Sequence, residues 1–486
     1  MSILNYAPAR HDEPPFLEAL DRISTAAKRH GKFVGILVSD GVAAKKTAEL
    51  YDIIAVGGDV KAISGWMGGH VKAAKAESLP SKRLDYEVLP LPKPDTMFEL
   101  LARFDKDTDP RKVNLAPGAY RDDNGLIWLL PSVKAATAAI ISLPTYEHQY
   151  LGIQGHVPFL RQAARLILGD VAVETGHIAS LQTSGGTGAC HTGAVFLKKF
   201  HDVGGDVDVF ISNPSWENHH AVFQHADFVT RSYRCYNAKT RSLDFAGMKA
   251  DVDTARRGSI FVLHVCAHNP TGCDPTDEQW DELSRIFKRK GLYAFLDCAY
   301  QGFATGDLVR DKYAVEAFLR EGVDMVVAQS FSKIAGLYGE RLGALHIPCR
   351  SEFAKVRVVE QLKAINRREV SVAPRFGADI MYHVLSDEAL KSQWISEVKI
   401  MSDRLSDMRR RLVAELQRLN TSCNWEHITK QRGMFSYTGL TAEQSRYMTD
   451  ECHAYMPPSG RLSVTGLTTS NVEYVARCMD HVVRHT

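Results

Sequence analysis

The chain has 486 residues, 45% of them hydrophobic and 24% charged, which is the composition of an ordinary globular protein. Its 59 lysines and arginines nearly balance 57 aspartates and glutamates, so the net charge of +2 argues against nucleic acid or an anionic membrane as a partner. No apolar run approaches the ~20 residues that span a bilayer, and the N-terminus has no features of a signal or transit peptide. Nine cysteines without a CxxC pair indicate neither a disulfide framework nor a zinc site. These features predict a cytoplasmic enzyme.

Residues 1–78 are predicted to form a short βαβ-like extension. The hydrophobic pattern indicates a helix at 15–29, buried strands at 32–39 and 53–60, and a helix between the strands at 41–51. Four prolines among charged residues then predict an extended linker at 79–95, because proline fixes φ and removes a backbone donor.

After the linker, the pattern becomes an alternation of strands and helices. Short apolar runs predict buried parallel strands at 209–211, 259–264, 293–296 and 325–328, and amphipathic helices such as 277–290 and 315–320 separate them. A helix-rich segment follows at 351–419, and further strands are predicted near 434–437 and 461–463. We therefore predict an α/β fold with a large doubly wound domain, residues 128–400, and a smaller α+β domain made from 96–127 and 401–486.

Polar side chains follow three successive predicted strands, at the carboxyl ends where α/β sheets bind ligands. They are Asn269, Asp297, Tyr300, Ser330 and Lys333. The glycines at 185–188 begin an apolar helix whose backbone N–H groups suit a phosphate, and Arg341 can bind a phosphate with two hydrogen bonds. A lysine for an imine, an aspartate for a ring nitrogen and a phosphate seat together indicate a pyridoxal phosphate site.

Eight segments, in their order and spacing, resemble the aspartate aminotransferases of the eukaryotic and enterobacterial type: 113–125, 148–155, 213–223, 266–272, 297–306, 329–343, 432–440 and 457–467. The resemblance runs from about residue 94 to the C-terminus. It implies a pyridoxal phosphate-dependent transferase of fold type I, active as a homodimer with shared active sites. It also implies the reaction, which moves an amino group between an aspartate-like dicarboxylic L-amino acid and 2-oxoglutarate.

The resemblance assigns roles to the matching residues around the cofactor. Lys333 would hold the cofactor as an imine and move a proton, and Asp297, supported by His264, would pair with the ring nitrogen. Tyr300 and Asn269 would bind the ring oxygen, and Trp216 would stack on the ring. The phosphate would be held by Gly186, Thr187, Ser330 and Arg341, and by Tyr150 of the neighbouring subunit. The catalytic residues would be Lys333, Asp297, Tyr300 and Trp216.

Two arginines would decide the substrate. Arg461 matches the residue that binds the α-carboxylate, beside Gly118, Asn269 and Trp216. Arg367 matches the residue that reaches across the dimer to the distal carboxylate, a task that suits a planar and permanently charged guanidinium.

Several residues depart from the family's pattern and are expected around the pocket: Pro117, Ile334, Ala335, Val372, Ala373, and the pair Cys190 and His191, where the family has leucine and arginine. They leave open a second hypothesis, in which the same cofactor supports decarboxylation, retro-aldol cleavage or carbon–carbon bond formation. A third hypothesis, a non-enzymatic scaffold, predicts the loss of a cofactor ligand, and the sequence keeps them all. No metal is expected, because the adjacent His219 and His220 are poor ligands as a pair.

The N-terminal part resembles a different family. Segment 31–63, with the helix before it, is similar to the last βα units of the HpcH/HpaI class of metal-dependent aldolases. Those enzymes are (β/α)₈ barrels whose metal ligands and catalytic residues lie earlier in their chains. The resemblance therefore implies that residues 1–78 are an aldolase-like fragment without a catalytic site.

Overall fold

The computed structural model describes residues 14–32, 35–38, 53–56, 86–92, 95–201, 204 and 207–485. The chain divides into two compact units, Met1–Lys93 and Pro94–Thr486, which we call the N-terminal unit and the main unit. Within the described ranges, no helix combines the length and the apolar character that crossing a bilayer requires.

The N-terminal unit contains the helix α1 (Pro14–Arg29), the strands β1 (Gly35–Val38) and β2 (Ile53–Val56), and the 3-10 turn η1 (Tyr86–Val88). The two strands pair in parallel. A parallel pair requires a crossover connection, and the helix predicted for it, at 41–51, lies outside the described residues. The predicted helix at 15–29 is present, as are residues 35–38 of the first predicted strand and residues 53–56 of the second.

A seven-stranded sheet forms the centre of the main unit, in the order β4-β12-β11-β10-β9-β5-β6. Its strands are β4 (Ile178–Ser184), β5 (Val209–Asn213), β6 (Thr230–Arg234), β9 (Ile260–His264), β10 (Tyr293–Cys298), β11 (Met325–Ser330) and β12 (Leu342–Pro348). The strands predicted from apolar runs are β5, β9, β10 and β11, and they run parallel to one another. Strand β12 runs antiparallel to both of its neighbours, so the sheet is mixed.

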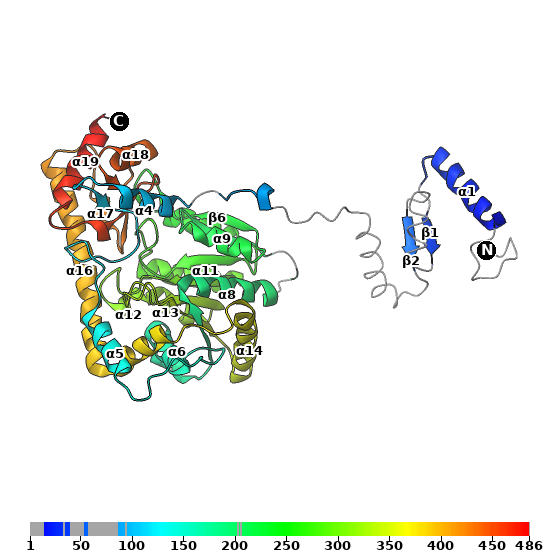
Figure 1. The fold of residues 1–486 in the computed structure, drawn as a ribbon, viewed down its shortest axis with the longest axis horizontal. Coiled ribbons are helices and arrows are strands. Elements are labelled where there is room, and N and C mark those ends of the chain that lie inside the picture. The colour runs from blue at the N-terminus through cyan, green and yellow to red at the C-terminus, as the bar shows by residue number, and fades with distance from the viewer. Residues whose placement is uncertain are drawn as a thin grey trace. The chain divides into compact units, whose positions relative to one another are not determined.

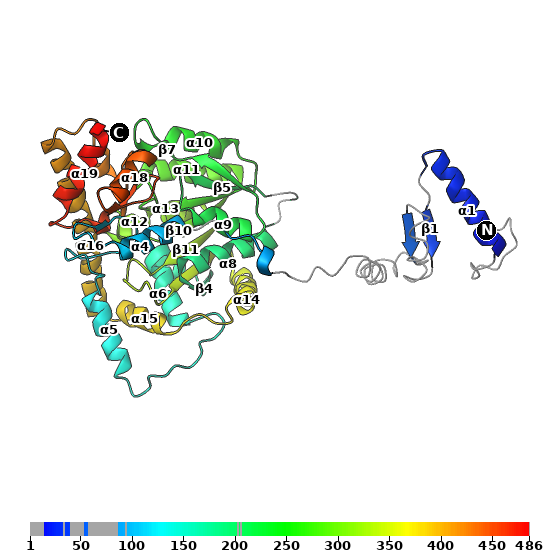
Figure 2. The ribbon, with the colours of Figure 1, turned by 45° about the horizontal axis from the view of Figure 1, so that its top comes forward.

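Helices cover both faces of this sheet (Figures 1 and 2). One face packs against α8 (Gly185–Phe200), α9 (Asn218–His225) and α14 (Glu352–Glu369). The other packs against α6 (Val157–Leu168), α10 (Phe245–Thr254), α11 (Asp277–Lys290) and α13 (Tyr313–Glu321). Strands buried on both faces have no polar side, which is why they could be read as continuous apolar runs. Shorter elements join these layers: α7 (Asp170–Glu174), α12 (Leu308–Asp311), and the paired β7 (Tyr236–Asn237) and β8 (Ser242–Leu243).

A third cluster of buried side chains lies along the long helix α16 (Glu388–Arg418). Figure 1 shows α5 (Pro131–Ile141) near one end of α16, and α17 (His427–Lys430) and α19 (Val472–His485) near the other. Helix α15 (Phe376–Ser386) contacts both α5 and α16.

Short elements surround the C-terminal end of α16. They are α4 (Thr96–Lys106), α18 (Ala442–Asp450), the 3-10 turn η2 (Val464–Gly466), and the pairs β3 (Val113–Asn114) with β14 (Ala454–Tyr455) and β13 (Phe435–Tyr437) with β15 (Arg461–Ser463). The β3–β14 pair joins the start of the main unit to its C-terminal part. A smaller domain built from 96–127 and 401–486 requires such a connection, although the division itself stays a prediction.

Candidate active site

A cavity of about 190 Å³ lies at the edge of the sheet where β9, β10 and β11 end. Most of the predicted site residues line it: Gly118, Gly186, Thr187, Trp216, His264, Asn269, Asp297, Tyr300, Ser330, Lys333 and Arg341. Cys190, which was expected around the pocket, lines it as well, together with Ala299, Ser332 and Tyr338, for which no role was predicted. Ser332 and Tyr338 belong to the segment 329–343, and the resemblance of that segment to the family could have identified them as site residues.

Lys333 lies just beyond the end of β11, next to the strand that carries Asp297. Its Nζ is 5.2 Å from the centre of the Tyr300 ring. Burial lowers the pKa of Lys333, the carboxylate of Asp297 opposes this shift, and the charge of Arg341 adds to it. A lysine with a lowered pKa supplies the neutral amine that attacks a carbonyl carbon.

The start of α8 forms a cradle with Arg341. Ser184 precedes the helix and gives it no side-chain cap, so the first backbone N–H groups have no side-chain acceptor there. Gly185 has a φ of +70°, and a Cβ at this position would lie 2.4 Å from Arg341 Nη2. A Cβ on Gly186 would lie 2.9 Å from the Cβ of Ser330. Only glycine leaves this space open. The backbone N–H groups at the helix start and the guanidinium of Arg341 are the kind of donors that bind a phosphate.

Asp297 is supported by His219, and the predicted support by His264 is wrong. Its Oδ2 lies 2.9 Å from His219 Nε2, and both side chains are buried. His219 Nδ1 lies 3.0 Å from Ser215 Oγ, which lies 3.2 Å from His264 Nε2. His264 therefore reaches Asp297 only through two other side chains, because the short helix α9 places His219 between them.

Each of these hydrogen bonds can be assigned a donor, and the donors follow one another from Asn269 towards Asp297. The backbone N–H of Asn269 donates to His264 Nδ1 over 3.4 Å. Burial lowers the pKa of His264 well below its usual value, so the ring is neutral and carries its proton on Nε2. That N–H donates to Ser215, the Ser215 hydroxyl donates to His219, and His219 Nε2–H donates to Asp297.

Arg461, on β15, is not among the residues that line the cavity but contacts Asn269, which is. Its Nη2 donates to the Ala116 carbonyl over 2.7 Å, and its Nη1 lies 3.5 Å from Asn269 Oδ1. The guanidinium lies 4.3 Å from the centre of the Phe435 ring, and burial lowers its pKa. Its Nε has no hydrogen-bond partner among the described residues. Such a group is ready to bind a carboxylate.

Tyr150 and Arg367 do not line the cavity. Tyr150 is 81% exposed, and Arg367 is exposed near the end of α14, where it donates to Ser371 Oγ. Both were assigned to the site of a neighbouring subunit, so their roles stay predictions.

Most of the departures from the family's pattern are not among the residues that line the cavity. Ile334 and Ala335 follow the lining residue Lys333 and are buried in the cluster along α16, where Trp394 Nε1 donates to the Ile334 carbonyl over 3.0 Å. Val372 and Ala373 do not line the cavity either, and the Pro117 carbonyl accepts a hydrogen bond from Ser463 Oγ. Of the departing residues, Cys190 alone lines the described cavity.

Taken together, these residues fit pyridoxal phosphate. The cradle at Gly185 and Gly186 suits its phosphate, Asp297 suits a protonated ring nitrogen, and Lys333 suits its aldehyde. The distances between these groups are set by the edge of one sheet, so one small molecule can reach all of them.

Comparisons with known proteins agree with this fit. The family model described as "Aminotransferase class I and II" matches residues 110–478. The mitochondrial aspartate aminotransferase of Gallus gallus is 42% identical over 393 residues, which cover 80% of this chain and 92% of that protein. The cytoplasmic aspartate aminotransferase of Saccharomyces cerevisiae is 42% identical with a TM-score of 0.80, covering 82% of this chain and 98% of the other. An aromatic-amino-acid aminotransferase from Burkholderia pseudomallei, covalently bound to pyridoxal phosphate, is 38% identical with a TM-score of 0.78, covering 82% and 100%.

Proposed function

Because this chain belongs to the class I and II aminotransferases, we propose that it transfers an amino group between an aspartate-like dicarboxylic L-amino acid and 2-oxoglutarate. Pyridoxal phosphate, its cofactor, supplies an electron sink for negative charge at the substrate's α-carbon when bound. Lys333 Nζ takes the proton from that carbon and returns it, since its lowered pKa favours the neutral amine. Trp216 and Tyr300 form walls of the cavity and exclude water.

The observation that carries the proposal is the partly buried guanidinium of Arg461, whose Nε has no hydrogen-bond partner among the described residues. A cation withdrawn from water is costly unless a partner compensates it, and an incoming carboxylate supplies that partner. The contact of Arg461 with Asn269 supports binding of the α-carboxylate at the edge that carries Lys333. For the distal carboxylate we propose Arg367 of a second copy of the chain.

A panel of amino donors tests the substrate. We expect aspartate and glutamate to convert the lysine-bound cofactor to its amino form, which is read as loss of visible absorbance, and alanine and phenylalanine to react poorly. Arg367→Ala should lower kcat/KM for aspartate at least about 30-fold, because an ion pair costs about 2 kcal/mol or more when one partner is removed. The reaction of alanine should not change.

Arg368→Ala is the matched control, because the neighbouring Arg368 donates to the Ala364 carbonyl of its own helix. Equal losses in the two variants would contradict the role of Arg367. Phenylalanine reacting as fast as aspartate would favour an aromatic substrate instead.

We also propose a homodimer with shared active sites. The support is that Tyr150 and Arg367, matched to cofactor and substrate ligands, are exposed and distant from the cavity of their own chain. Mixing equal amounts of Lys333→Ala and Arg367→Ala chains should restore about a quarter of the aspartate activity, because half of the dimers are mixed and hold one intact site. No recovery after subunit exchange would mean that each chain uses its own Arg367.

The cytoplasm is the proposed location. The relatives that carry a compartment in their names come from both the cytoplasm and the mitochondrion. Fractionation of cells that express the full chain, probed for this protein against mitochondrial markers, decides between the two.

A further inference from the structure

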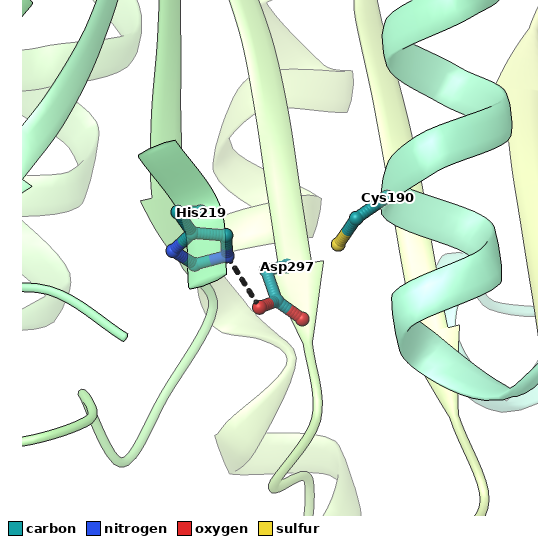
Figure 3. Close-up of side chains that lie close together, drawn as sticks. All are labelled: Cys190, His219 and Asp297. Carbon is teal, nitrogen blue, oxygen red and sulfur yellow. Dashed lines mark hydrogen bonds and ion pairs between the residues drawn. The ribbon is translucent and has the colours of Figure 1, made fainter. Parts of the chain in front are cut away.

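Three buried side chains with metal-binding atoms converge at the wall of the cavity, which Cys190 and Asp297 line. Cys190 Sγ, His219 Nε2 and a carboxylate oxygen of Asp297 all lie within 4.8 Å of one another. Figure 3 shows Asp297 between the two others, with the thiol approaching from α8 and the imidazole from α9. Cys190 takes the place of a leucine in the family's pattern, so the third potential ligand is a departure of this chain.

The grouping differs from the pair that the sequence suggested. His220 turns away, and its Nδ1 lies 3.0 Å from Thr230 Oγ1. His219 faces Asp297 instead. The possible ligand set is therefore made by three elements of the fold, and adjacent histidines play no part in it.

We propose that Cys190, His219 and Asp297 bind one borderline divalent cation, zinc by preference, when pyridoxal phosphate is absent. Thiolate, imidazole and carboxylate are ligands of zinc, and a thiolate disfavours magnesium and calcium. Zinc bonds of about 2.0–2.3 Å in a tetrahedron place ligand atoms about 3.3–3.6 Å apart. The present spacings, 2.9 Å for the closest pair and at most 4.8 Å, bracket these values. A water molecule would complete the tetrahedron.

The binding step releases one proton. Zinc binds the thiolate, so the Cys190 thiol gives up its proton to the solvent when the cation binds. The proton of His219 moves from Nε2 to Nδ1, and the resulting Nδ1–H donates to Ser215 Oγ. Asp297 contributes a carboxylate oxygen.

The cation and the cofactor exclude one another, because Asp297 cannot serve the ring nitrogen and the metal together. Zinc at ten times its Kd should therefore weaken pyridoxal phosphate about tenfold. This competition does not depend on which amino acid the enzyme uses, so its failure and the failure of the substrate proposal are separate results.

Cobalt tests the site, because Co²⁺ occupies zinc sites and is visible by absorbance. The full chain, freed of pyridoxal phosphate, is titrated with Co²⁺. We expect one ion per chain, with a sulfur-to-cobalt charge-transfer band and strong tetrahedral visible bands. Cys190→Ser should lose the charge-transfer band. Cys235→Ser is the matched control, since Cys235 is also buried beside a histidine, with Sγ 3.9 Å from His268 Nε2, and should keep it.

Pyridoxal phosphate added first should prevent the bands, and Zn²⁺ should remove them. A charge-transfer band that persists in Cys190→Ser overturns the proposal, as does Co²⁺ binding that saturating pyridoxal phosphate leaves unchanged. Thermal unfolding midpoints check the fold of each variant. If Cys190→Ser does not fold, Cys190→Leu replaces it, and the competition in the unaltered chain decides without any variant.

Discussion

Asp297 shows how neighbouring side chains define the chemistry of one residue. On one side it accepts a hydrogen bond from His219, whose other nitrogen is bound to Ser215. A carboxylate oriented in this way can face the ring nitrogen of pyridoxal phosphate. The proposed role of acid and base is left to Lys333.

Removal of this support should weaken the cofactor. We predict that His219→Phe, which keeps an aromatic ring but loses both nitrogens, weakens pyridoxal phosphate about 10- to 150-fold, because a hydrogen bond to a charged group is worth about 1.5–3 kcal/mol. Fluorescence titration of the cofactor-free chain measures this. His220→Phe should have little effect, since His220 bonds only Thr230. Similar losses in both variants would show that the effect is general destabilisation.

At the scale of the element, α5 and α8 are among the helices that begin without a side-chain cap, and their starts are used differently. The start of α5 receives a carboxylate from α16, where Glu397 Oε1 accepts from the Ser132 backbone N–H over 3.0 Å. The start of α8 receives no side chain and faces Arg341 across Gly185. Because an N-terminus favours negative charge, a buried glutamate satisfies the first helix and a phosphate suits the second.

A methyl group at the start of α8 tests this reading. Gly185→Ala should weaken pyridoxal phosphate at least about tenfold, since alanine is strained at positive φ and its Cβ would displace Arg341. Binding of pyridoxal, which has no phosphate, should change much less. Gly339→Ala is the control, because a Cβ there meets open space. Equal loss of both ligands would mean that the cradle does not hold the phosphate.

At the scale of the whole molecule, every residue that lines the described cavity belongs to the main unit. The N-terminal unit contributes a helix and a parallel strand pair, and the crossover between those strands lies outside the described residues. The aldolase resemblance of residues 1–78 stays a prediction, and so does the absence of a catalytic site there.

Deletion of residues 1–78 should therefore leave cofactor binding unchanged. The truncated chain keeps all lining residues from Gly118 to Arg341, and Arg461 beside them. Absorbance titration measures the affinity for pyridoxal phosphate, and sedimentation velocity measures the oligomeric state of both chains. A weaker affinity or a smaller assembly in the truncated chain would show that the N-terminal unit is needed for the site or for the interface.

The elements that could be predicted are those with a local signal. The helix at 277–290 has its capping box at Thr276 and its glycine at 291, so α11 begins and ends as predicted. The reversed direction of β12 could not be read, because strand residues do not encode the direction of the neighbouring strand. The same holds for His219 and Cys190. Their meeting at Asp297 depends on the order of the strands, which no local pattern contains.

The reversal of β12 has a consequence for how this site tolerates change. Because β12 returns antiparallel beside β11, its first residues start at the same edge at which β11 ends. Lys333 and Arg341 thus face one cavity from a single connection, the segment between the two strands. The length of that connection therefore determines how far apart the proposed aldehyde and phosphate ligands lie. Insertions there would separate the two ends of the ligand's seat, so natural variation in chain length should accumulate in other loops.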